Sequence, residues 1–291
     1  MGFMANIKGR QAYTQHGKGN YAEALRMYEE AYKAGMDDPK LLLAWSSLLV
    51  RSAEYQKARD LLVKIQKAPG MTPEQKMQLF CNYAACVYQM GEIDKGIAIL
   101  ERQHAKAPTG LAYETLGYLY VVRCEQKPTD EEQQAALERI AEAEAAAKEA
   151  AEAAPEEGET ETAPAPVPAE PEKTPMEKWE ALKEKAKAFL DEAVDYDDED
   201  AICLDNLAQY FYRVLGDKAA AKTLFDKAIA IKETQIDTLW FLSRYDVESG
   251  DTARAIERLK KAAQGRFSPL NYANRDMIRE ELARLGAALE D

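Results

Sequence analysis

The residues best able to do chemistry form an acidic run at 195–200, Asp-Tyr-Asp-Asp-Glu-Asp, whose spaced oxygens match the start of a calcium-binding loop. Such a loop needs a glycine at its sixth position for a sharp turn and a bidentate glutamate at its twelfth. Here the sixth position is Asp200 and the twelfth is Asn206. The run is therefore predicted to be a solvated turn that places carboxylates at the N-terminus of the next helix, where the helix dipole favours negative charge.

Other reactive side chains are scattered. His16 and His104 stand alone, and an isolated histidine seldom makes a metal site. Cys81 and Cys86 are five positions apart, so on a helix they point to different faces. The stretch 17–19, Gly-Lys-Gly, lacks the spacing and the Ser or Thr of a phosphate-binding loop. We expect no catalytic set, no cofactor and no metal.

The composition favours a folded protein with one strongly acidic segment. The formal net charge is -13, of which residues 130–173 carry -11. No basic stripe with interleaved aromatic residues is present, so nucleic-acid binding is not expected. No stretch has the apolar length of a membrane span. Four cysteines (81, 86, 124 and 203) without a Cys-x-x-Cys pair indicate a reducing compartment, and the expected location is cytoplasmic.

A pattern of small and large side chains recurs along the chain. A small residue is followed by a large apolar one four positions later and by another apolar residue three positions after that, which places all three on one face of an α-helix. Two pairs of such blocks are 34 residues apart. The matching residues are Ala24, Tyr28 and Ala31 with Ala58, Leu62 and Ile65, and Ala221, Phe225 and Ala228 with Ala255, Leu259 and Ala262.

A partner helix is visible upstream of these blocks. In the stretch 113–120, Tyr113, Leu116, Gly117 and Tyr120 share one helical face. Glycine stands in the turn between the two helices of several pairs, where a left-handed helix end is needed. The small residue allows a neighbouring helix to approach closely, and the large one fills the space beside it. One hairpin cannot bury this stripe alone, so successive hairpins must stack.

The pattern resembles the tetratricopeptide-repeat (TPR) family, whose 34-residue unit has a W-x-x-L-G-x-x-Y helix and an A-x-x-x-F helix. Residues 113–120 match the first helix with Tyr in place of Trp, and 221–225 match the second. Pro108 and Pro269 follow second helices, where the family often has proline. The resemblance implies an all-α fold, a right-handed α-α superhelix (a TPR solenoid) of about six helical hairpins. A C-terminal capping helix is expected within 271–289.

The chain is predicted to divide into three parts. Residues 1–124 hold repeats one to three and the first helix of repeat four. Residues 125–174 form an acidic insert rich in Ala, Glu and Pro, helical over 129–153 and disordered or extended over 155–175. Residues 175–291 hold the second helix of repeat four, repeats five and six, and the capping helix. The insert is either a passive tether or an acidic segment that steers basic partners or covers the groove.

In the TPR family the first helices line a concave groove in which partner segments lie. The resemblance and the helical spacing together indicate eight groove-facing candidates, which are Arg51, Asn82, Tyr88, Tyr118, Asn206, Tyr210, Trp240 and Arg244. Aromatic and arginine side chains suit a protein-binding surface. The alternative is that several of them, Trp240 above all, simply pack between helices. The paired basic residues with which some members hold a C-terminal carboxylate are absent or misplaced.

The expected function is therefore a scaffold or adaptor that binds a peptide or helix of another protein in the groove. The alternative is a regulatory sensor whose acidic insert gates the groove. An enzyme is disfavoured, because it would need a pocket with a cluster of titratable groups of shifted pKa. The pattern specifies neither the partner nor the oligomeric state.

Overall fold

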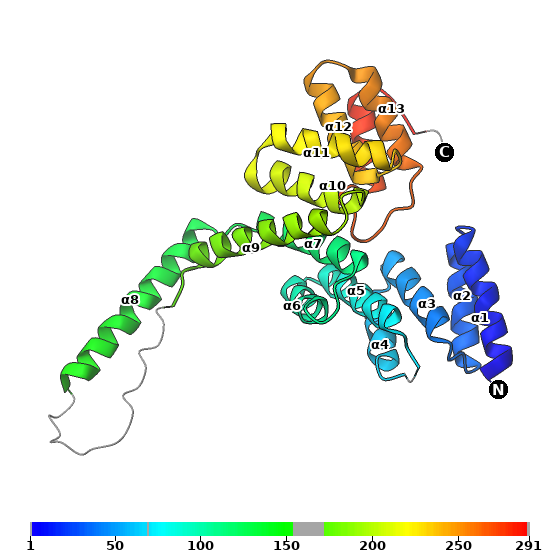
Figure 1. Ribbon diagram of the computed structural model, residues 1–291, viewed down its shortest axis with the longest axis horizontal. Coiled ribbons are helices and arrows are strands. Elements are labelled where there is room, and N and C mark those ends of the chain that lie inside the picture. The colour runs from blue at the N-terminus through cyan, green and yellow to red at the C-terminus, as the bar shows by residue number, and fades with distance from the viewer. Residues whose placement is uncertain (1, 69, 154–171, 290–291) are drawn as a thin grey trace. The chain divides into compact units, whose positions relative to one another are not determined.

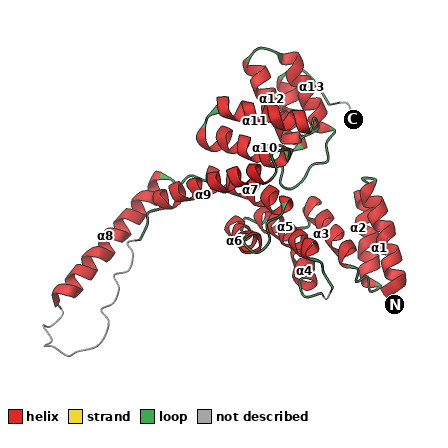
Figure 2. Ribbon diagram, in the orientation of Figure 1, coloured by secondary structure: helices red, strands yellow, loops and turns green. Residues whose placement is uncertain are grey.

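The computed structural model describes residues 2–68, 70–153 and 172–289, without the side chains of 150–153. Helices are the only regular elements in these residues, as Figure 2 shows. The chain forms two compact units. Unit 1 consists of Met1–Arg123 and Lys187–Asp291, and unit 2 of Cys124–Ala186. The three-part division by residue composition stays a prediction.

Unit 1 is built from antiparallel helix pairs that follow one another along the chain (Figure 1). The first three are α1 (Gly2–Gly17) with α2 (Tyr21–Lys33), α3 (Pro39–Arg51) with α4 (Tyr55–Ile65), and α5 (Pro73–Gln89) with α6 (Ile93–His104). Next come α7 (Gly110–Glu125) and α9 (Pro175–Tyr196), then α10 (Ala201–Gln209) with its π-helical continuation η1 (Tyr210–Leu215) and α11 (Lys218–Ile231). The last are α12 (Ile236–Glu248), α13 (Thr252–Ala263) and the capping helix α14 (Arg275–Arg284). The predicted all-α superhelix is confirmed.

The turns inside the hairpins follow the predicted chemistry. Gly216 and Gly250 have φ angles of 69° and 83°, in the left-handed region that a glycine adopts without steric cost. The aspartate after each glycine then caps the next helix. Asp217 accepts a hydrogen bond from the backbone N–H of Ala220, and Asp251 accepts one from Arg254.

The small residues of the repeat pattern allow the close helix contacts. Ala58 and Ala221 have no solvent exposure, and neither does Phe225, four positions after the second of them. At Gly96, which takes the same place in α6, a Cβ atom would lie 3.2 Å from the backbone oxygen of Ala84 in α5. At this position the second helix of the hairpin therefore touches the backbone of the first.

Replacing Ala221 by leucine should accordingly lower the free energy of unfolding by about 1–3 kcal/mol, because overpacking forces neighbouring helices apart. Ala219, which is exposed on the same helix, supplies the matched control. Ala219→Leu is expected to change stability by no more than about 0.5 kcal/mol. Urea unfolding followed by helical circular dichroism measures both, and equal effects would contradict the packing rule.

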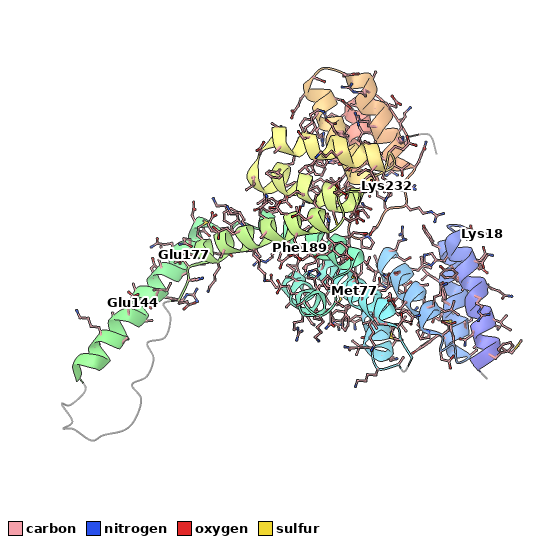
Figure 3. All side chains as sticks on the ribbon, in the orientation of Figure 1. Lys18, Met77, Glu144, Glu177, Phe189 and Lys232 are labelled. Carbon is pink, nitrogen blue, oxygen red and sulfur yellow. The ribbon has the colours of Figure 1, made fainter. Side chains whose placement is uncertain are left out.

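The part of α9 that belongs to unit 1 packs against α7. The ring of Phe189, labelled in Figure 3, lies 5.3 Å from that of Tyr113, whose hydroxyl donates to Glu192 at 2.7 Å. Gly117 of α7 leaves room for Leu190, since a Cβ there would lie 3.2 Å from a methyl group of that leucine. Residues far apart in sequence thus complete one helix pair.

Unit 2 contains α8 (Asp130–Ala153) and the first half of α9. Both helices begin with capping boxes, in which Thr129 pairs with Glu132 and Thr174 with Glu177. The indole N–H of Trp179 donates to the carbonyl of Cys124 at 2.8 Å. The described side chains of α8 are mostly exposed, as expected for a helix with little to bury. Of the stretch 155–175 predicted to be disordered or extended, residues 155–171 lie outside the described residues.

The capping helix α14 closes the series of repeats. Asn274 accepts a hydrogen bond from the backbone N–H of Met277 and starts the helix. Ile278 and Leu282, four positions apart, are fully buried against the last hairpin. Glu281 of the same helix pairs with Arg244 of α12 at 2.5 Å. None of the described helices is long and apolar enough to cross a membrane.

Candidate partner-binding cavity

Unit 1 contains a partly open cavity of about 520 Å³. Side chains from α3, α5, α7, α10 and α12 line it, and these are all first helices of their hairpins. A loop between α13 and α14 supplies a further wall, with Arg266, Pro269 and Leu270 among its lining residues. The volume is within the range of ligand-binding sites in proteins, roughly 300–1,000 Å³.

Four of the eight candidate groove residues line this cavity, namely Arg51, Asn82, Tyr118 and Asn206. Asn82 is 8% exposed and ties two helices together, because its amide donates to the Ser46 hydroxyl of α3 at 3.0 Å. Asn206 does the same between α10 and α7 by donating to the Glu114 carbonyl at 2.9 Å. Burial raises the pKa of Tyr118 well above its usual value, so its hydroxyl stays protonated.

The other four candidates lie outside the cavity lining. Tyr88 is half-buried and packs edge-on against Tyr118, with ring centroids 6.0 Å apart. Tyr210 is buried at the start of η1, and Trp240 is buried in the core of repeats five and six. The guanidinium of Arg244 lies over the Trp240 ring at 4.3 Å. Trp240 therefore packs between helices.

A buried aspartate forms part of the cavity floor. Asp205 of α10 is 2% exposed and accepts hydrogen bonds from the Thr238 hydroxyl at 2.5 Å and the Gln209 amide at 2.7 Å. Arg213 in turn donates to Gln209 at 2.6 Å and orients that amide. Burial, and then the neighbouring Asp237 carboxyl, raise the pKa of Asp205 to about 7.

Asp237, at the start of α12, anchors the loop that follows α13. Its two carboxylate oxygens accept hydrogen bonds from the Asn271 side chain at 3.1 Å and from the backbone N–H groups of Tyr272 and Ala273, each at 3.0 Å. Burial raises the pKa of Asp237, while these three donors act in the opposite direction. The carboxyl group therefore has a structural role in fixing the loop.

Glu114 of α7 is the third acidic residue of the lining. Burial, and then the neighbouring Asp200 carboxyl, raise the pKa of Glu114 to about 7, against the opposing effect of Lys232. Lys232, labelled in Figure 3 just after α11, also lines the cavity. Asp200 itself caps α10 by accepting hydrogen bonds from two backbone N–H groups, in line with the predicted role of the acidic run.

The sequence patterns do not single out the three carboxyls or the loop. A partial signal exists for Asp205 and Asp237, since each is a charged residue inside an otherwise apolar stretch of a first helix. Such a residue is almost never buried unless it is partnered. The loop has no comparable signal. Only its hydrogen bonds to distant helices reveal that it lines the cavity.

The remaining reactive residues are structural in the described part of the chain. All four cysteines are buried thiols, and burial raises the pKa of Cys81 to about 12. His104 packs edge-on against the ring of Tyr113 at 4.5 Å. Among the residues with described positions, no cluster of His, Cys, Asp and Glu could hold a metal ion.

No protein-family model and no curated protein sequence matches the chain. Solved structures do match. One is TTC0263, a thermophilic TPR protein of Thermus thermophilus, with TM-score 0.56 and 14% identity over 85% of this chain and 98% of that one. Another is PilW, a type IV pilus biogenesis factor, with TM-score 0.53 and 14% identity over 88% and 90%. A human IFIT1 dimer with m7Gppp-AAAA gives TM-score 0.53 and 15% identity over 90% of this chain and 48% of that one.

These matches confirm the resemblance that the repeat pattern indicated. The chain has the TPR fold. Identities of this size show a shared architecture. They do not indicate that these proteins bind the same ligand.

Proposed function

We propose that the protein is a non-catalytic scaffold or adaptor that binds a segment of another protein in the cavity of unit 1. The supporting observation is that five successive first helices contribute side chains to one cavity of about 520 Å³. Its lining combines apolar residues such as Val50 and Ile202 with amide groups such as Gln78 and Asn82. A polypeptide presents both apolar side chains and main-chain hydrogen-bonding groups, so this mixture suits a peptide ligand.

A protein partner fits the cavity better than a nucleic acid. The lining holds three acidic residues, Glu114, Asp205 and Asp237, and three basic ones, Arg51, Lys232 and Arg266, so it has no excess of basic groups. Nucleic-acid binding sites gain most of their affinity from basic groups facing phosphates. Because one structural relative was solved with m7Gppp-AAAA, that RNA is the appropriate negative probe. Salt-dependent binding of it to this chain would contradict the assignment of a protein partner.

The three carboxyls with raised pKa are the kind of cluster that an enzyme would need, and their contacts favour a structural role. The oxygens of Asp205 and Asp237 are hydrogen-bonded to groups of the fold itself. A general acid or base must instead reach the proton of a substrate. Glu114 interacts with Asp200, whose carboxyl caps α10. The Cys81 thiol of the lining has a pKa of about 12, so it is not a thiolate nucleophile near neutral pH.

We also propose the cytoplasm as the location. The four cysteines are buried thiols. Cysteines that stay in the reduced form are typical of reducing compartments.

The test is a cavity variant with a matched surface control. Ile202→Arg places a large cation in the cavity, whereas Val63→Arg places the same side chain at a half-exposed position of α4. Affinity capture from the source cells with mass spectrometry identifies partners of the wild-type chain. Ile202→Arg is expected to weaken their capture about tenfold or more, as for a central interface residue.

Val63→Arg should retain the partners, and both variants should keep the helical circular dichroism of the wild type. If partners are captured equally by Ile202→Arg and the wild-type chain, the cavity is not where they bind.

A further inference from the structure

The loop between α13 and α14, orange in Figure 1, is hydrogen-bonded to the C-terminal ends of three successive first helices. We name residues 265–273 the strap. Arg266 donates to the carbonyl of Gly17 at the C-terminal end of α1, at 3.1 Å. Arg51, the last residue of α3, donates to the carbonyl of Phe267. Gln89, the last residue of α5, donates to the carbonyl of Pro269 at 2.6 Å.

The donors on α3 and α5 are oriented by their own neighbours. The Tyr55 hydroxyl donates to the side-chain oxygen of Gln89 at 3.4 Å, which turns the amide N–H₂ of Gln89 toward Pro269. The Arg51 guanidinium lies over the Tyr21 ring at 5.6 Å. Two side chains of the first helices thus bind main-chain carbonyls, as they would in holding a peptide of another protein.

The strap is also shaped to fit. Ser268 and Asn271 close a turn, because the backbone N–H of Asn271 donates to the carbonyl of Ser268 at 3.0 Å. Leu270 packs against the core of repeats one to three. At Gly265 a Cβ atom would lie 2.6 Å from the Ile236 side chain, so glycine permits the strap to pass close to α12.

We propose that the strap is an autoinhibitory segment that occupies part of the partner-binding surface. A partner polypeptide binds by displacing the strap and accepting the hydrogen bonds that Arg51 and Gln89 donate to the strap carbonyls. This inference rests on the proposed function, because the strap competes only if the cavity receives a polypeptide. The anchor at Asp237 holds residues 271–273 in place while residues 266–270 are released. The strap then remains attached to α12 and can return when the partner leaves.

The first test measures strap release in the full chain by limited trypsin digestion. Trypsin cuts after Arg266, whose side chain is exposed, but it must also bind the half-buried residues that follow in an extended form, so cutting requires the strap to open locally. The double variant Arg51→Ala with Gln89→Ala should be cut there about tenfold faster than the wild-type chain, because two hydrogen bonds to the strap are lost. The matched control is Arg26→Ala with Gln56→Ala, whose side chains lie on second helices, and it should be cut at the wild-type rate. Equal rates for the two double variants would overturn the proposal.

The second test asks whether the surface under the strap accepts a peptide. Residues 266–270 are replaced by Gly-Ser-Gly-Ser-Gly, and the probe is a capped, fluorescein-labelled peptide with the sequence of residues 264–272. The replaced chain should bind the probe at least about tenfold more tightly than the wild-type chain, in which the strap competes. Adding Arg51→Ala and Gln89→Ala to the replaced chain should remove the gain. Equal binding to both chains, or no binding to a replaced chain with native circular dichroism, would overturn the proposal.

The two proposals fail in different experiments. If the cavity is not a partner site, Ile202→Arg leaves partner capture unchanged. If the strap is only a structural loop, Ile202→Arg still weakens capture while the probe peptide binds the wild-type and strap-replaced chains alike.

Discussion

Replacing Phe225 by alanine is expected to lower the free energy of unfolding by about 3–5 kcal/mol, a large part of the roughly 5–15 kcal/mol that stabilises a typical domain. Phe225 is the large residue of the second-helix pattern in repeat five and has no solvent exposure. Its ring stacks on that of Phe241 in α12, with centroids 5.1 Å apart and planes 12° apart. The alanine variant loses this contact and leaves a cavity between two repeats.

The position of Phe225 explains why its effect should extend beyond one hairpin. Tyr212 and Tyr272 each lie 5.0 Å from the ring of Phe241, so the aromatic contacts run from repeat five through repeat six to the strap. The matched control is Ile231→Ala on the same helix, where the side chain is 46% exposed. That variant should change stability by no more than about 0.5 kcal/mol. Urea unfolding of both variants tests the difference, and a Phe225→Ala effect below about 1 kcal/mol would show that repeats five and six do not share a core.

The repeat pattern was readable because hairpin packing imposes it at a fixed spacing. Ala221 and Phe225 must occupy one helical face, and the neighbouring hairpin repeats the requirement 34 residues later. The capping boxes at Thr129 and Thr174 follow from equally local chemistry, since the two partners of each box are three residues apart. Local rules of this kind depend only on residues near one another in the sequence.

The candidate site was less readable because it depends on side-chain direction and on distant contacts. Arg51 and Arg244 have the same groove-facing spacing in the sequence. The first lines the cavity, while the second pairs with Glu281 of the capping helix. Neighbouring residues of a helix point in directions about 100° apart, so an error of one residue in the assumed register exchanges a cavity-facing position for a packed one. The strap contacts join Gln89 to Pro269 across 180 residues, and no periodic pattern reports a pairing over such a separation.

The pH dependence of stability should reveal the buried Asp205. Its pKa is raised from 3.8 to about 7 in the folded chain. Below pH 3.8 the carboxyl is protonated in both states. Between pH 3.8 and 7 the folded chain retains a proton that the unfolded chain has released, so stability falls as the pH rises; above about 7 the loss is complete. A shift of this size corresponds to about 4 kcal/mol lost between pH 4 and pH 8.

Asp205→Asn isolates this contribution. The other carboxyls also change the stability with pH, some raising it and some lowering it, and their effects cancel when the curve of the variant is subtracted from that of the wild-type chain. Glu281, whose pKa is lowered by Arg284, is one that acts in the opposite sense. The asparagine cannot ionise, so its curve of unfolding free energy against pH should fall less steeply than that of the wild type, by up to about 4 kcal/mol over this range.

The absolute stability of Asp205→Asn is a poorer readout than its slope. Asparagine offers one acceptor oxygen where the carboxylate offers two, so the Gln209 amide and the Thr238 hydroxyl cannot both donate to it as before, and this change in hydrogen bonding is present at every pH. The matched control is Asp226→Asn, at a half-exposed carboxylate paired with Lys222 at 2.7 Å, and its curve should run parallel to that of the wild type. Urea unfolding at about pH 4, 5, 6, 7 and 8 provides the curves. An Asp205→Asn slope equal to that of the wild type would mean that Asp205 is ionised in the folded chain throughout this range and that the floor of the cavity carries its charge.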